Sequence, residues 1–170
     1  DIHIAPGNHD VIDRSLFTKE MAKRGHPKSY YAFTHSQDLF LVLDPNLDNW
    51  NIAGAQLDFL RQTLTKADQY RHIFVFAHQL IWYKDQAPWN KCLPNSWQGK
   101  ADQLTYHEDV LPLFQQVDNS VFIFSGDVGA VPNSLAICQF EEGTIQYIVS
   151  GMGVDEKDNF LMVDVADDGA

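Results

Sequence analysis

The stretch Pro6-Gly7-Asn8-His9-Asp10 decides how the rest of this sequence is interpreted. It follows a short apolar run at residues 2–5, which is typical of a β-strand. We therefore expect Asn8, His9 and Asp10 at a strand tip, because ligands of open α/β sheets bind beyond the carboxyl ends of the strands. An amide oxygen can bind a hard cation, an imidazole can bind a metal or move a proton, and a carboxylate can orient either. The stretch thus predicts a polar site at one edge of a sheet.

The composition indicates one globular domain spanning residues 1–170. The chain has 170 residues, of which 45% are hydrophobic, and no linker or repeat divides it. A formal net charge of -11 argues against nucleic acid as a partner, because such proteins need a basic patch. No apolar run has the length of a membrane span. Cys92 and Cys138 could form one disulfide or be two free thiols, so the compartment stays open.

Hydrophobic periodicity predicts an order of elements in which strands first alternate with helices and then dominate. We expect helices at residues 12–24, 55–67 and 108–116, and strands at residues 29–34, 39–43, 72–77, 121–124, 135–140, 145–149 and 160–165. The Trp-rich segment 79–106 has no period, and it should either line a substrate pocket or cover the core. This order favours an α/β sandwich of two sheets with helices outside.

Two further strand ends carry polar residues that can complete a site. His78 follows the predicted strand at 72–77, and Asp127 follows the one at 121–124. If these strands are parallel neighbours, their tips meet Asn8 in one crevice. The resulting mixed nitrogen and oxygen set suits a divalent cation such as Mn, Fe or Zn. Alternatives remain: His78 could be a core histidine, Asp127 an ordinary turn residue and Asp10 a helix N-cap.

Residues 7–10, Gly-Asn-His-Asp, resemble the Gly-Asn-His-Asp/Glu block of the calcineurin-like metallophosphoesterases. His78 resembles the lone His of the fourth block of that family. Residues 125–129 resemble the fifth block, but the family writes Gly-His-x-His where this sequence has Gly126-Asp127-Val128-Gly129. The first two blocks, Asp-x-His and Gly-Asp, have no counterpart before Asn8. The letters of Asp1-Ile2-His3 match the first block, but they occupy the approach to the third.

The resemblance implies a two-sheet α/β sandwich and hydrolysis of a phosphate mono- or diester by metal-activated water. Asn8, His78 and Asp127 would hold a divalent metal, and His9 would protonate the leaving group with Asp10 beside it. The substrate would be a small-molecule or other phosphoester. An alternative function is a non-catalytic binding domain that keeps the fold with a degenerate metal site.

The sequence starts without Met inside a predicted strand, so we expect a fragment of a longer protein that is inactive as this chain alone. The missing strands would leave a sheet edge open. Because open edges tend to pair, we also expect a possible homodimer through residues 1–5.

Overall fold

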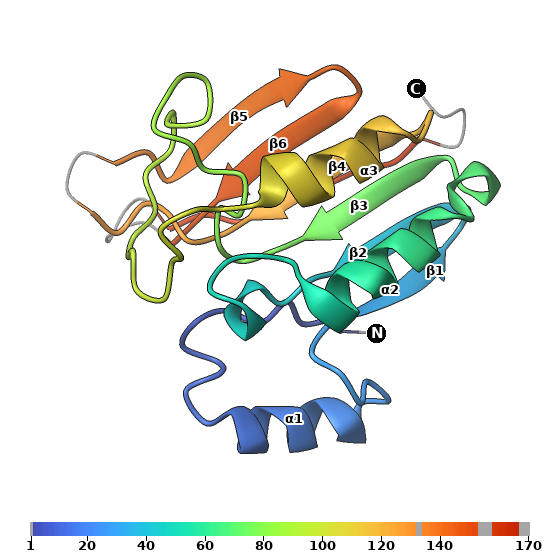
Figure 1. The fold of residues 1–170 in the computed structure, drawn as a ribbon, viewed down its shortest axis with the longest axis horizontal. Helices are drawn as coiled ribbons and strands as arrows, with labels where there is room; N and C mark the ends of the chain where they lie inside the picture. The colour runs from blue at the N-terminus through green and yellow to red at the C-terminus, as the bar shows by residue number, and fades with distance from the viewer. Residues whose placement is uncertain (1, 132–133, 153–157, 167–170) are drawn as a thin grey trace.

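The chain forms an α/β fold with one six-stranded mixed sheet and three α-helices in its computed structural model, which describes residues 2–131, 134–152 and 158–166 (Figure 1). The spatial order of the strands is β1-β2-β3-β4-β6-β5. Neighbours from β2 through β3 and β4 to β6 are parallel, whereas β1 and β5 are antiparallel edge strands. The carboxyl ends of four strands therefore lie at one edge of the sheet. The strands are β1 (Tyr31–His35), β2 (Asp38–Val42), β3 (His72–Phe76), β4 (Ser120–Ser125), β5 (Ile137–Glu142) and β6 (Ile145–Ser150).

Two helices cover one face of this sheet (Figure 1). They are α2 (Gly54–Leu64) and α3 (Leu111–Gln115), and a π-helical turn at Tyr106–Val110 leads into α3. Leu57 and Leu60 of α2 and Phe114 of α3 belong to the same buried cluster as Leu41 of β2 and Val75 of β3. Alternate strand residues point to this side, which gives the sheet its buried apolar face.

The helix α1 (Arg14–Lys23) lies apart from the other two and packs in a separate small cluster. Its buried residues Phe17 and Met21 belong to this cluster together with Tyr31 and Val42. Two 3-10 turns, η1 (Pro45–Leu47) and η2 (Ala67–Gln69), follow β2 and α2. The longest described helix has 11 residues, and none of the described helices is long and apolar enough to cross a membrane.

The opposite side of the sheet carries a row of phenylalanines that we call the aromatic face. Neighbouring rings stack across the strands, with centroids 4.8 Å apart for Phe33 and Phe40, and 5.0 Å apart for Phe40 and Phe74. The row continues at 5.2 Å from Phe74 to Phe122. Most of these rings are only partly buried. The members of the face are Phe33, Phe40, Phe74, Phe76, Phe122 and Phe124.

The predicted strands at residues 2–5 and 160–165 are wrong, because neither segment pairs with a strand in the described part of the chain. The Ile4 amide instead donates to the Tyr31 hydroxyl at 2.9 Å. Phe160 and Met162 are 81% and 79% exposed, so the other described residues do not bury these two side chains of the later segment. The other six predicted strands and the three helices are confirmed, with shifted ends. The described residues form one sheet, and a second sheet of the expected sandwich is not among them.

Residues 79–106, which we call the Trp loop, close over one end of the core. Trp82 and Trp89 are buried, and the Trp82 ring meets Phe140 edge to face at a centroid distance of 5.0 Å. A disulfide between Cys92 and Cys138 ties the loop to β5. This first part of the Trp loop therefore covers the core, as one of the two alternatives for this segment predicted.

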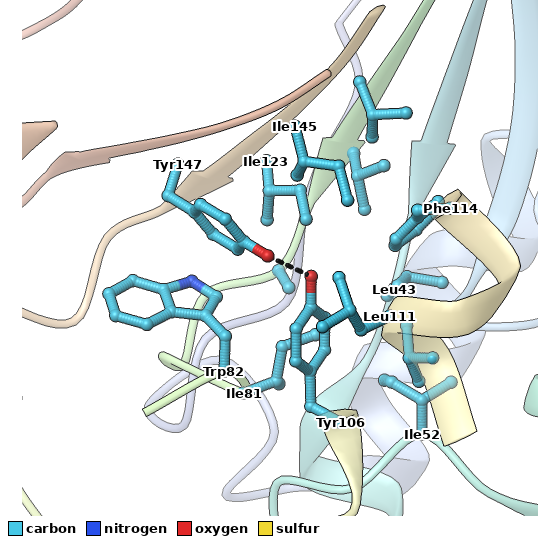
Figure 2. Close-up of a cluster of buried hydrophobic side chains, with 14 of the residues drawn as sticks. Leu43, Ile52, Ile81, Trp82, Tyr106, Leu111, Phe114, Ile123, Ile145 and Tyr147 are labelled. Atoms are coloured by element: carbon cyan, nitrogen blue, oxygen red, sulfur yellow. Dashed lines mark hydrogen bonds between the residues drawn. The ribbon is translucent and has the colours of Figure 1, made fainter. Parts of the chain in front are cut away.

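Two tyrosine hydroxyls meet inside the core beside Trp82 (Figure 2). The Oη atoms of Tyr106 and Tyr147 are 2.8 Å apart, and either can be the donor. Burial raises the pKa of both phenols, that of Tyr106 well above its ordinary value. Both groups are therefore neutral, and each hydroxyl has the other as its partner.

Replacing Tyr106 with Phe is expected to lower the free energy of unfolding by about 1–3 kcal/mol, because it leaves the buried Tyr147 hydroxyl without its partner. Tyr147→Phe should have a similar effect. The double variant should cost less than the sum of the two, since it removes both polar groups together. Urea unfolding of the four proteins at neutral pH measures this coupling, and strictly additive losses would show that the two hydroxyls do not depend on each other.

Candidate functional site

The ends of β3 and β4 bring two of the candidate residues together. The amides of Gly126 and Asp127 both donate to the His78 carbonyl, at 3.0 and 3.1 Å. These bonds continue the contact between the two strands past their last paired residues. As a result, His78 Nε2 lies 4.0 Å from Asp127 Oδ1.

Asn8 reaches the same place from the loop that precedes α1. Its Oδ1 lies 3.2 Å from His78 Nε2. The amide oxygen and the Asp127 carboxylate therefore both converge on one imidazole nitrogen. The structure brings together the three residues that the sequence suggested as metal ligands, although Asn8 does not sit at a strand tip.

Glycines make room for the imidazole on two sides. A Cβ on Gly7 would lie 3.2 Å from both Cδ2 and Nε2 of His78, and a Cβ on Gly126 would lie 3.3 Å from Nδ1. Gly151, which follows β6, packs so closely against the turn after β4 that a Cβ would be 2.1 Å from the Val128 carbonyl oxygen. Gly153 lies outside the described residues.

Burial shifts the pKa values of two residues of the site, His78 and Asp127. Burial lowers the pKa of His78, and the Asp10 carboxylate opposes this effect. His78 is thus a neutral imidazole, which is the form that binds metals. Burial raises the pKa of Asp127 to about 6, against a smaller opposite effect of His9. The favourable effect of His9 on the ionised Asp127 carboxylate is therefore smaller than the cost of burying its charge.

His9 and Asp10 occupy the solvent-facing side of this group. The His9 side chain is exposed, and it acts electrostatically on both His78 and Asp127. Asp10 Oδ2 accepts a 2.8 Å hydrogen bond from the Gly7 amide and so closes the loop. The N-cap of α1 is Asp13, so the alternative that Asp10 caps this helix is wrong.

Sequence reasoning missed a buried polar network behind the site. Asp44, which follows β2, is fully buried and ion-paired with Arg14. The Asn46 amide donates to the Pro6 carbonyl at 3.2 Å and to Asp44 Oδ1 at 3.0 Å. Its oxygen accepts from Gln79 Nε2 at 2.5 Å. Asn46 therefore links the segment before Asn8 to the residue after His78. Asp44 could have been found from the sequence, because it follows a buried strand as His78 and Asp127 do.

Three side chains around His78 Nε2 could hold a divalent cation. Ligand atoms at about 2.0–2.2 Å from one ion in tetrahedral geometry lie roughly 3.3–3.6 Å from each other. The 3.2 Å separation of Asn8 Oδ1 from His78 Nε2 is close to this spacing, and the 4.0 Å separation of Asp127 Oδ1 is longer. The set contains one amide, one imidazole and one carboxylate. Within the described ranges, no group of three or more His, Cys, Asp and Glu side chains could hold a metal ion, so any such site depends on Asn8.

Comparisons with known proteins do not assign the chain to a family. No protein-family model matches the sequence, and no curated protein matches it significantly. The interpretation of the site therefore rests on its own geometry and on the motif resemblance.

Proposed function

We propose that this chain is part of a metal-dependent phosphoesterase of the calcineurin-like class, which hydrolyses a phosphate mono- or diester with metal-activated water. One observation carries the proposal. Asn8 Oδ1 and Asp127 Oδ1 converge on His78 Nε2 at 3.2 and 4.0 Å, at positions where the resemblance implies ligands. Asn8 and Asp127 are 119 positions apart in the sequence. The fold therefore brings these residues together.

Each residue of the site has a role in this proposal. Asn8, His78 and Asp127 hold the cation, and the glycines on both sides of His78 keep its ring in place. A bound divalent ion lowers the pKa of water and neutralises charge on the phosphate. His9 is exposed beside Asn8, where its ring can give a proton to the departing alkoxide oxygen. Asp10 closes the loop that carries His9 by accepting a hydrogen bond from the Gly7 amide.

The aromatic face supports the two-layer sandwich that belongs to this class. The segments 2–6 and 158–166 contribute residues to cavities on this face, including one of about 300 Å³ that Ala5, Phe76 and Leu161 help to line. A larger cavity of about 630 Å³ adjoins Phe33 and Phe40. We infer that this apolar face packs against a second layer.

A second candidate function is a binding domain of the same fold without catalysis. The observation that favours it concerns Gly129, which stands where the family has a second metal-binding His. Gly129 has a φ of 95°, and a Cβ there would lie 2.9 Å from Ala136. The backbone at this position thus excludes a histidine.

Metal binding and hydrolysis together test the proposal in the natural protein. We expect Mn²⁺ or Zn²⁺ to bind and to be required for hydrolysis of p-nitrophenyl phosphate or bis(p-nitrophenyl) phosphate. Asn8→Ala should weaken metal affinity about 10–100-fold or more, because it removes one of three ligands. Calorimetric titration and steady-state rates measure both quantities.

The control is Asn90→Ala, which removes an exposed asparagine of the Trp loop and should change neither quantity. Metal binding that depends on Asn8 without any hydrolysis would favour the binding domain. Metal binding that is indifferent to Asn8, His78 and Asp127 would contradict both functions.

A further inference from the structure

A cavity of about 290 Å³ adjoins the candidate site. Three segments line it: the loop carrying Asn8 and His9, the turn from Asn46 to Trp50, and the tip of the Trp loop at Gln98 and Gly99. Because Asn8 and His9 belong to both the site and the cavity, a molecule at the site has direct access to this space.

Hydrogen bonds between the last two segments build the wall opposite the site. The Trp50 Nε1 donates to the Gln98 carbonyl at 3.3 Å, and the Ala101 amide donates to the Asn49 carbonyl at 3.0 Å. The Trp97 ring also stacks on Trp50 with a centroid distance of 6.1 Å. The second part of the Trp loop therefore lines a pocket, while its first part covers the core.

The turn that forms this wall is held in an unfavourable conformation. Asn49 and Trp50 are consecutive non-glycine residues with φ values of 52° and 72°. Such residues cost free energy and cluster at ligand sites, where the surrounding structure must enforce them. Here the hydrogen bond from the Trp50 amide to the Pro45 carbonyl, at 2.9 Å, and the one from the indole to Gln98 enforce the turn.

The chemistry of the lining indicates what the cavity can bind. Four carboxamide side chains, those of Asn8, Asn46, Asn49 and Gln98, offer both donors and acceptors, and His9 adds an imidazole. No Asp, Glu, Lys or Arg is among the described residues that line it, so the lining does not select a charged ligand. The volume is near the lower end of the range of ligand pockets, about 300–1,000 Å³. A small neutral molecule with several hydroxyl groups fits these properties.

We propose that this cavity binds the alcohol portion of the substrate, and that this alcohol is a small polyol or monosaccharide. The inference rests on the proposed phosphoesterase function. His9 lines the cavity next to the candidate metal ligand Asn8, so the oxygen it protonates is the one bonded to the group in the cavity. The phosphate binds on the metal side, and the carboxamides hold the hydroxyls of the leaving group.

Two variants test the cavity without disturbing the fold. Gln98→Ala removes an exposed side chain but keeps the carbonyl that Trp50 uses. Asn49→Gly removes the amide and relieves the positive φ. In the natural protein, each variant should raise KM for glycerol phosphate and glucose phosphate about 2–10-fold, because each loses about one hydrogen bond to the substrate. KM for ethyl phosphate should stay unchanged, and so should every constant of the control Gln86→Ala, an exposed glutamine of the Trp loop that lies outside the cavity lining.

A binding measurement separates failure of this inference from failure of the phosphoesterase function. Saturation-transfer NMR with methyl glucoside and with glycerol should detect binding that both variants weaken. If the wild-type protein hydrolyses ethyl phosphate and the two variants change KM equally for all substrates, the role of the cavity is overturned. The phosphoesterase function then stays intact. If the wild-type protein hydrolyses nothing, the phosphoesterase function fails. Saturation transfer that is weaker in both variants would then still support a polyol site, and saturation transfer that neither variant changes would overturn it.

Discussion

Replacing His9 with Ala in the natural protein is expected to lower the rate of alkyl phosphate hydrolysis by about a hundredfold to ten-thousandfold, the usual contribution of a positioned general acid. Hydrolysis of p-nitrophenyl phosphate should change much less, because its phenolate leaves without a proton. His9→Gln should behave like His9→Ala, since an amide can form hydrogen bonds but cannot deliver a proton at neutral pH. Steady-state rates on both substrates, with metal in excess, measure the difference.

Asn8→Ala provides the contrast for this experiment. It weakens the cation that both reactions need, so it should slow both substrates together. Equal losses on the two substrates for His9→Ala would reject the role of His9 as the acid. The His9 side chain is exposed, so its replacement removes little packing and should leave the fold unchanged.

Removing the disulfide is expected to have the largest effect on stability. Cys92 and Cys138 are 46 residues apart in the sequence. A cross-link of that span lowers the entropy of the unfolded chain by an amount worth about 4 kcal/mol. The variant with Cys92→Ala and Cys138→Ala should lose about this much free energy of unfolding in urea.

The wild-type protein in dithiothreitol is the matched control for the disulfide. It keeps both cysteine side chains, so it separates the loss of the cross-link from the loss of two buried sulfur atoms. Its stability should fall close to that of the double variant, and the double variant should not respond to dithiothreitol. An unchanged unfolding midpoint on reduction would show that the bond contributes no stability.

The sequence predicted those parts of the fold that depend on local patterns. The helix at Ala55 and the buried strand before His78 have clear periodicity, and their positions follow from it. The meeting of His78 with Asp127 followed from a general property of parallel strands, whose carboxyl ends share one edge. Residues 2–5 show the limit of such reasoning. Their composition is that of a strand, but strand formation needs a partner, and a local pattern does not specify one.

The parts of the site that the sequence did not reveal depend on contacts between distant segments. Asp44 looks like a turn residue beside Pro45, and its burial and its pairing with Arg14 depend on where β2 lies in the sheet. The cavity wall joins Trp50 to Gln98, which are 48 residues apart. Nothing in either segment alone indicates the other. The roles of the four tryptophans were equally hidden, because burial of each ring depends on the path of the Trp loop.

The way the candidate site is assembled has a consequence for folding kinetics. The contact between Asn8 and His78 closes a separation of 70 residues, and the contact with Asp127 needs the pairing of β3 with β4 as well. Parallel pairings of this kind have high contact order and form slowly, because chain entropy decreases before the contacts compensate for it. The helices, whose contacts are local, are expected to form before these three side chains lie in one place. The chain can therefore bind a cation through these side chains only after the central strands have paired in their final order.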